Sequence, residues 1–178
     1  MDPEGWPTQE SERAHYLTHE NDPSQEGYRQ FLGRLVTPML AILDPTMITL
    51  DYGSGPGPAV CTLLQDSGVK CHNYDPFFGP LDLEPPYDAI VCTETAEHFH
   101  HPGESFMHML GLLKPGGVLG ILTQRWTDLD RFATWGYVRD PTHTTFYHER
   151  TFEWMTQAWG LDIIWNNERD AIILRKHA

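Results

Sequence analysis

A glycine-rich turn between a short apolar strand and a helix constrains the fold of this chain more than any other feature. The predicted strand Met47–Asp51 leads into the glycines Gly53, Gly55 and Gly57, and the predicted helix Ala59–Ser67 follows directly. Open α/β sheets bind their ligands at strand-to-helix turns of this kind. The turn therefore predicts an α/β fold with a ligand site at the carboxyl-terminal edge of the sheet.

Strands and helices continue to alternate along the chain, a pattern typical of a mostly parallel sheet. The other expected strands are Val69–Tyr74, Ala89–Thr93 and Val118–Thr123, and the other expected helices are Gln25–Leu43, Glu104–Leu113 and Glu149–Trp159. A short link joins the last two strands, Asp162–Trp165 and Ala171–Arg175, and predicts an antiparallel hairpin. The length of 178 residues suits one domain, which we take as residues 1–178.

The charge of the chain restricts its partners. With 25 acidic and 12 basic residues, the formal net charge is −13, and the basic residues are scattered without forming a patch. Such a surface repels phosphate backbones and anionic lipids. We therefore expect no nucleic-acid or membrane partner, and a small neutral or cationic ligand or a protein instead.

The cysteines and the first residues favour a cytoplasmic location. Cys61, Cys71 and Cys92 are odd in number and contain no C-x-x-C pair, which argues against a disulfide framework or a zinc knuckle. The acidic N-terminus lacks the apolar core of a secretory signal, and no apolar run approaches the roughly 20 residues that span a bilayer.

The turn could bind one of two classes of ligand, a dinucleotide or a cation without phosphate. Alternatively, it could connect the strand and the helix without binding any ligand. A dinucleotide site requires G-x-G-x-x-G, and its third glycine falls on Pro58. Pro56 and Pro58 also lack the N–H groups that would bind phosphate, and Asp51 adds a negative charge there. A cationic ligand without phosphate suits the turn better, because glycines allow close approach and Asp51 can contact the cation.

The motif D-x-G-x-G-x-G at Asp51–Gly57 resembles the first motif of class I S-adenosylmethionine-dependent methyltransferases. Asp75, at the end of the next strand, is similar to the acidic residue with which that family binds both ribose hydroxyls. The two oxygens of a carboxylate match a vicinal diol. The resemblance also places Pro76 and Phe77 against the adenine, and implies S-adenosylmethionine as the cofactor.

Two later motifs extend the resemblance. Tyr87–His98 resembles the fourth-strand motif of the subgroup that contains the ubiquinone-biosynthesis O-methyltransferases, and Leu112–Gly117 resembles the turn before the fifth strand. The implied fold is a Rossmann-like class I methyltransferase sandwich with a mostly parallel sheet and the C-terminal antiparallel hairpin. The proline-rich link between Asp75 and Tyr87 is too short for the helix and strand that the family usually has there. We therefore expect about six strands, with one edge strand missing.

The first candidate cluster for the chemistry is Glu94, Glu97 and His98. The resemblance places Glu94 among the cofactor-binding residues, and implies that E-x-x-E-H can hold a divalent ion near a catechol. His98 is then a candidate catalytic residue. The alternative, which we favour over a metal, is that Glu97 and His98 cap or pair around the start of a loop.

The second candidate cluster lies in the substrate-side loop, residues 125–147. Its segment Asp140–Tyr147 resembles a D-x-x-H-x-x-x-(Y/F) stretch found in many small methyltransferases, which implies that His143 faces the transferred methyl group as a general base. The alternative is a structural histidine. The aromatic side chains of this loop either wall an acceptor or form a lid with a core of its own; they are Trp126, Trp135, Tyr137 and Tyr147.

The N-terminal lid segment and helix, residues 1–43, form the third piece. Prolines and charges predict that residues 1–24 are loosely ordered unless they pack over a ligand. The resemblance implies a helix over the cofactor, with Tyr16 or His19 reaching its methionine carboxylate. Because no separate substrate domain is expected, we predict O- or N-methylation of a small-molecule acceptor. The alternatives are a non-catalytic S-adenosylmethionine-binding or regulatory protein, and a Rossmann-like dehydrogenase.

Overall fold

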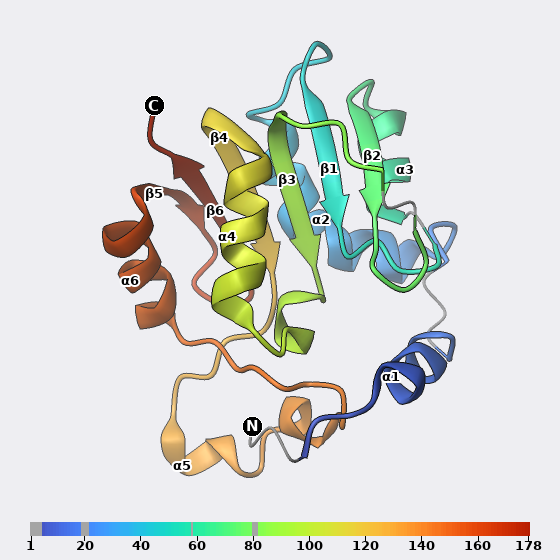
Figure 1. The fold of residues 1–178 in the computed structure, drawn as a ribbon, viewed down its shortest axis with the longest axis vertical. Coiled ribbons are helices and arrows are strands. Elements are labelled where there is room, and N and C mark those ends of the chain that lie inside the picture. The colour runs from blue at the N-terminus through green and yellow to red at the C-terminus, as the bar shows by residue number, and fades with distance from the viewer. Residues whose placement is uncertain (1–4, 19–21, 58, 80–81) are drawn as a thin grey trace.

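A six-stranded sheet forms the middle layer of the chain, with helices on both faces (Figure 1). The computed structural model describes residues 5–18, 22–57, 59–79 and 82–178. The sheet order is β2-β1-β3-β4-β6-β5. The strands are β1 (Ile48–Tyr52), β2 (Lys70–Tyr74), β3 (Tyr87–Thr93), β4 (Leu113–Leu122), β5 (Leu161–Asn166) and β6 (Ala171–Lys176).

The strand directions confirm the predicted sheet. β1 pairs in parallel with β2 and β3, and β4 continues the parallel order beside β3. Asp51 lies opposite Asn73 of β2 and Val91 of β3. β6 runs antiparallel to both β4 and β5, so the C-terminal hairpin is confirmed. β2 lies at the sheet edge, in agreement with the expected loss of one edge strand.

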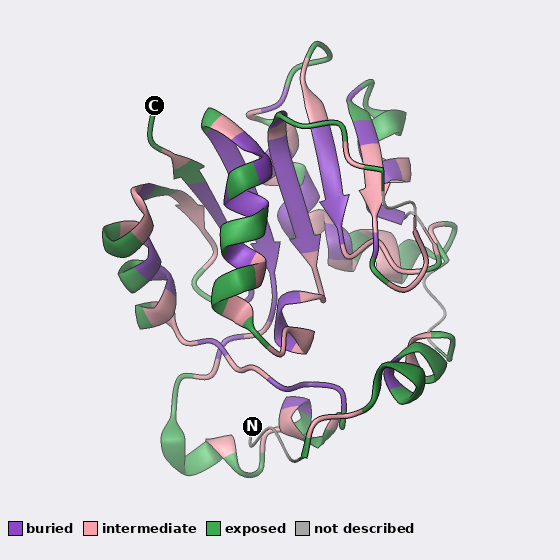
Figure 2. Cartoon of the chain, in the orientation of Figure 1, coloured by how far each residue is buried: buried purple, intermediate pink, exposed green. Residues whose placement is uncertain are grey.

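Alternating side chains of the strands fill two cores, one on each face of the sheet. Ile90 and Cys92 of β3 face the core formed with α4 (Pro102–Leu112) and α6 (Glu149–Trp159). Ala89 and Val91 face the core on the other side, which contains buried residues of the two remaining long helices. Those helices are α2 (Glu26–Leu40) and α3 (Ala59–Asp66). The central strands are accordingly buried along most of their length (Figure 2).

Four short elements lie beyond the carboxyl ends of the parallel strands (Figure 1). They are α1 (Gln9–Tyr16), η2 (Ala96–His98), α5 (Leu129–Phe132) and η3 (Gly136–Arg139). The helix that the resemblance implies in residues 1–24 is α1, and Thr8 caps it by accepting from the Ser11 N–H. His19 lies outside the described residues. Within the described parts of the chain, no helix has the length and apolarity to cross a membrane.

One strand begins earlier than predicted. β4 starts at Leu113, where the sequence suggested a turn through Lys114–Gly117 before a strand at Val118. Leu113 pairs with Tyr87, and the register then shifts before Val118 pairs with Ala89. The glycines are thus accommodated as an irregularity within the strand pair.

A disulfide joins two cysteines that the sequence analysis left unpaired. Cys61 of α3 and Cys71 of β2 are bonded, with their Cα atoms 5.1 Å apart, while Cys92 is free and buried. The expectation of no disulfide is therefore wrong. Its physical reason is that α3 packs on the strand that follows it, which a count of cysteines cannot show. The bond joins α3, which follows the glycine-rich turn, to β2, which precedes Asp75.

Removing this bond should lower the stability of the fold. Closing a loop of this length contributes about 3 kcal/mol by restricting the unfolded chain. We expect Cys71→Ala to lower the free energy of unfolding by about that amount, measured by urea titration. A reductant should lower the wild-type midpoint and leave the midpoint of the variant unchanged. Equal wild-type midpoints with and without reductant would contradict the bond.

Candidate functional site

The glycine-rich turn is held against the end of β2 by backbone hydrogen bonds. The N–H groups of Gly53 and Ser54 donate to the Tyr74 carbonyl, at 2.8 and 3.1 Å. Gly53 and Gly55 have positive φ angles of 84° and 63°. A Cβ on Gly53 would lie 2.2 Å from Cγ2 of Thr95, so the turn excludes any side chain there. Glycine thus permits both the conformation and the close approach.

Asp75 is fixed by three backbone N–H groups. Gly55 N donates to Oδ2 at 2.8 Å, and Phe77 N and Phe78 N donate to Oδ1 at 2.8 and 3.1 Å. Asp75 is buried; Oδ1 already accepts two N–H groups, whereas Oδ2 accepts one and has a lone pair left for a further donor. Oδ2 can therefore accept from one ligand hydroxyl without losing its own support, and a second hydroxyl would share Oδ1 with the backbone N–H groups.

Two carboxyl groups beside this turn, on buried Asp51 and half-buried Glu94, each have a buried oxygen without a partner. Asp51 Oδ1 and Glu94 Oε1 form no hydrogen bond within the described part of the chain. Burial and the charge of Asp75 raise the pKa of Asp51 to about 7. Burial and the charge of Glu97 raise the pKa of Glu94 to about 9. Because leaving such oxygens unpaired costs free energy, this crevice is suited to a cationic ligand.

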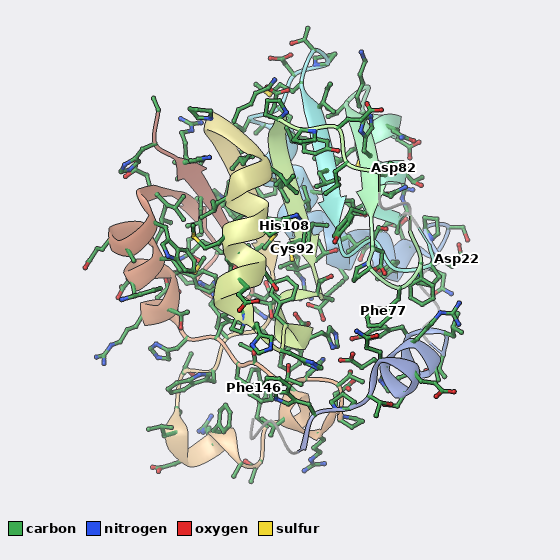
Figure 3. The ribbon with its side chains drawn as sticks, in the orientation of Figure 1. Asp22, Phe77, Asp82, Cys92, His108 and Phe146 are labelled. Carbon is green, nitrogen blue, oxygen red and sulfur yellow. A yellow bond between two sulfur atoms is a disulfide. The ribbon has the colours of Figure 1, made fainter. Side chains whose placement is uncertain are left out.

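The other predicted donor-site residues border the same crevice. Pro76 and Phe77 follow Asp75 directly, and Gly57 accepts from Ala59 N at the start of α3, at 2.8 Å. Phe77 lies between the end of β2 and α1 (Figure 3). Pro58, where a dinucleotide site would have its third glycine, lies outside the described residues.

Helix α1 spans the opening from the donor side to the substrate-side loop. The Tyr16 ring contacts those of Phe77 and His98, with centroids 5.7 and 5.1 Å apart. At the same end of the helix, Nε2 of the neighbouring His15 lies 3.4 Å from Asp140 Oδ2. The structure thus places Tyr16 at the boundary between the two halves of the site.

His98 and His143 lie side by side although they are distant in sequence. Thr142, which directly precedes His143, is 44 residues from His98. The ring centroids of the two histidines are 4.9 Å apart. Nδ1 of His98 is 3.0 Å from the Thr142 carbonyl, and Nδ1 of His143 is 2.7 Å from the Tyr137 carbonyl. Since a carbonyl only accepts, both rings carry a proton on Nδ1.

Asp140 is a site residue to which the sequence analysis gave no role. Its Oδ2 lies 3.9 Å from Nε2 of His143, in addition to its contact with His15. Although burial opposes it, hydrogen bonds from Thr142 and the nearby histidines lower the pKa of Asp140 to about 2. The D-x-x-H spacing was the available signal, because it places the two side chains within one turn of chain.

Glu97 joins the two histidines in a group that could hold a metal. Ligand atoms of Glu97, His98 and His143 all lie within 4.8 Å of one another. The Glu97 carboxylate also accepts from the hydroxyls of Tyr137 and Thr123. Burial raises the pKa of Glu97 to about 7, against the lowering effect of these bonds. Glu97 and His98 thus form pairing contacts with the 125–147 loop, as the alternative to a metal site predicts. The geometry could also accommodate a cation.

The aromatic side chains of the 125–147 loop mostly pack on one another. Tyr147 belongs to the core beside α4, and its hydroxyl donates to the Ala96 carbonyl at 2.8 Å. Trp135 packs on Tyr137 and Phe146, and Trp126 on His148. Of the two alternatives, the buried position of Tyr147 fits the lid with its own core, because this tyrosine anchors the loop to the sheet. The observed arrangement is that of a lid with a core of its own.

Comparisons with known proteins agree with this fold. The model of a family described as "Methyltransferase domain" matches residues 24–165. A comparison with curated protein sequences finds no match.

Solved methyltransferase structures have the same fold at low sequence identity. A SAM-dependent methyltransferase from Archaeoglobus fulgidus is 17% identical with a TM-score of 0.53, covering 84% of this chain and 99% of its own. Human N-acetylserotonin methyltransferase, solved with SAM, is 19% identical with a TM-score of 0.60, covering 99% and 62%. Magnesium protoporphyrin IX methyltransferase from Synechocystis, with bound SAH, is 15% identical with a TM-score of 0.58, covering 94% of each chain.

The family match covers most of the chain, and it includes the glycine-rich turn, Asp75 and both histidines. The sheet order and the placement of these residues at the carboxyl ends of the strands are in accord with it. The chain belongs to the methyltransferase-domain family.

Proposed function

We propose that this protein is a methyltransferase that uses S-adenosylmethionine to methylate an oxygen or nitrogen of a small molecule. The observation that carries the proposal is the pair of buried, unpartnered carboxyl oxygens on Asp51 and Glu94 beside the glycine turn. S-adenosylmethionine has a sulfonium and an ammonium and no phosphate, so its charges suit these groups. A dinucleotide would bring phosphates to the same carboxyl groups, which disfavours the dehydrogenase alternative.

Different residues of the crevice bind different parts of the donor. Asp75 accepts from the two ribose hydroxyls, while Asp51 and Glu94 face the positive charges. Pro76 and Phe77 cover the adenine, and Tyr16 reaches the methionine carboxylate from α1. Gly53, Gly55 and Gly57 let the backbone approach the methionine part closely. Residues 1–178 then act as one domain, with residues 1–43 as the lid segment and helix and 125–147 as the substrate-side loop.

His143 is the proposed general base. When bound, the cofactor supplies a methyl group on a sulfonium, whose carbon–sulfur bonding electrons stay on sulfur as the acceptor atom bonds the carbon. His143 Nε2 takes the proton that the acceptor loses, and Asp140, 3.9 Å away, stabilises the resulting imidazolium. The adjacent His98 helps to orient the acceptor. Much of the rate comes from holding the acceptor in line.

The nature of the acceptor follows from charge and from the lid. A net charge of −13 disfavours nucleic acid and membrane surfaces. The lid is formed by α1 and the 125–147 loop, which favours a small acceptor.

We retain the cytoplasm as the proposed location. The Cys61–Cys71 disulfide argues against it, because disulfides are rare in reducing compartments.

Transfer of labelled methyl groups tests the proposed activity. The protein should transfer radiolabel from S-adenosylmethionine to a low-molecular-weight compound of a metabolite extract, and fractionation would identify that acceptor. His143→Asn should lower the rate by about 100-fold or more, because it removes the base. Donor binding without transfer to any compound of a complete cell extract would favour a non-catalytic binding protein.

Asp75→Ala should weaken donor binding. Losing a charged acceptor of two hydroxyls costs about 1–3 kcal/mol, which corresponds to a roughly 5- to 150-fold higher Kd for S-adenosylhomocysteine. Calorimetry gives this value directly. Asp66→Ala, which removes an exposed carboxylate paired with Arg29 at 3.1 Å, should bind like the wild type. Unchanged affinity in the Asp75 variant would exclude the ribose role.

Donor affinity should rise with pH. The pKa of Asp51 is about 7 in the ligand-free fold, above its unfolded value of about 3.9, so its proton stabilises the fold at low pH. That stability is lost between about pH 4 and 7, as the pH rises. A cationic donor favours the ionised carboxylate, so the affinity for S-adenosylmethionine should rise about tenfold from pH 6 to 8. Asp51→Asn should flatten this dependence, and an equally steep curve in the variant would assign it to another group.

A further inference from the structure

The turn at the end of β3 anchors the substrate-side loop, and one residue in it holds both flanks of the proposed base, one through its side chain and the other through its backbone carbonyl. We infer that Glu97 is a positioning residue for His143. The inference rests on the proposed function, in which His143 takes the proton of the acceptor. Glu97 was considered in the sequence only as a metal ligand or a local cap.

The side chain of Glu97 acts through Tyr137. The Tyr137 hydroxyl donates to Oε1 of Glu97, and Thr123 donates to Oε2 at 2.9 Å. The Tyr137 carbonyl in turn accepts from Nδ1 of His143 at 2.7 Å, and the two rings lie 4.1 Å apart between centroids. Holding Tyr137 therefore fixes the orientation of the His143 ring through its Nδ1.

The backbone of Glu97 holds the other flank. The N–H groups of Thr144 and Thr145, which directly follow His143, both donate to the Glu97 carbonyl at 2.9 Å. His143 is thus tied to Glu97 from the residues after it and, through Tyr137, from a residue before it. A displacement of this one turn would move the base relative to the sheet.

The charge of Glu97 indicates more than a packing role. Its side chain is fully buried, and no lysine or arginine forms an ion pair with it among residues 5–18, 22–57, 59–79 and 82–178. Burying a carboxylate without a cation costs free energy, whereas a glutamine could accept from Tyr137 at a lower cost. The carboxylate oxygen lies within 4.8 Å of His143, where it favours the imidazolium that forms as the acceptor loses its proton.

Three variants separate bond, charge and general stability. Glu97→Gln keeps a hydrogen-bond acceptor and loses the charge, while Tyr137→Phe keeps the charge and loses the bond. Tyr87→Phe is the matched control, because it also removes one buried tyrosine hydroxyl, which accepts from Glu84 N at 3.0 Å at the opposite end of β3. The readouts are kcat and KM for the acceptor identified above, the Kd for S-adenosylhomocysteine, and the NMR signal of the His143 Nδ1–H, assigned by its absence in His143→Asn.

We expect kcat to fall by about tenfold or more in Glu97→Gln and in Tyr137→Phe, with KM and the donor Kd within about twofold of wild type. The Nδ1–H signal of His143 should shift or broaden in Tyr137→Phe, which needs no acceptor to observe. Tyr87→Phe should keep the wild-type kcat and signal even where its melting temperature falls.

Wild-type kcat in both Glu97→Gln and Tyr137→Phe, with His143→Asn inactive, would overturn the role of Glu97 and leave the proposed function intact. An unchanged Nδ1–H signal in Tyr137→Phe would also overturn it. A rate that collapses in EDTA and returns with Mg²⁺, with Tyr137→Phe at the wild-type rate, would assign Glu97 to a cation instead. Wild-type kcat in His143→Asn would instead exclude the proposed base itself.

Discussion

The parallel pairing of β1 with a neighbour on each side is the constraint on which the site depends. Because β1, β2 and β3 run in the same direction, the turns that follow them all lie at one edge of the sheet. The glycine turn after β1 can therefore donate backbone N–H groups to Tyr74 and Asp75 at the end of β2. Glu94 and Glu97, which follow β3, meet the same crevice from the other side. A change of register in either pair would separate these groups.

The crevice combines a rigid backbone with carboxyl groups that the fold alone does not satisfy. Asp75 has three backbone donors, whereas Asp51 and Glu94 each leave a buried oxygen without a hydrogen bond among the described residues. Glu94 also has a positive φ of 47°, a conformation that is unfavourable for a residue with a side chain. These features lower the stability of the ligand-free protein. Binding a cation would offset that cost, and under the proposed function this would link donor affinity to the protonation of Asp51.

The donor half of the site could be predicted because its signals are local in sequence. The glycine turn, Asp75 and the strands that bear them occupy one contiguous stretch, and the missing strand was visible from the short link before Tyr87. The start of β4 was misjudged because glycines suggested a turn where the strand pair contains an irregularity. The Cys61–Cys71 bond depends on how α3 packs on β2, which the spacing of cysteines does not encode.

The acceptor half depends on contacts between distant residues and could be predicted only in part. His98 and His143 were identified from motifs, yet nothing in the sequence shows that they meet. Glu97 and Tyr137 are 40 residues apart, and their contact follows from the way the 125–147 loop folds back on the turn after β3. Helix α1 was anticipated from the resemblance, whereas its contact with Asp140 required the structure. Local sequence patterns therefore indicated the cofactor, whereas the arrangement around the proposed acceptor site follows from tertiary contacts.

A calorimetric titration of the wild-type protein with S-adenosylhomocysteine, with NADH as the comparison ligand, tests the central claim most directly. The account predicts saturable binding of S-adenosylhomocysteine with one site per chain and no detectable binding of NADH, because the crevice carries unpartnered carboxyl groups where a dinucleotide would place its phosphates. Binding of NADH without binding of S-adenosylhomocysteine would contradict it.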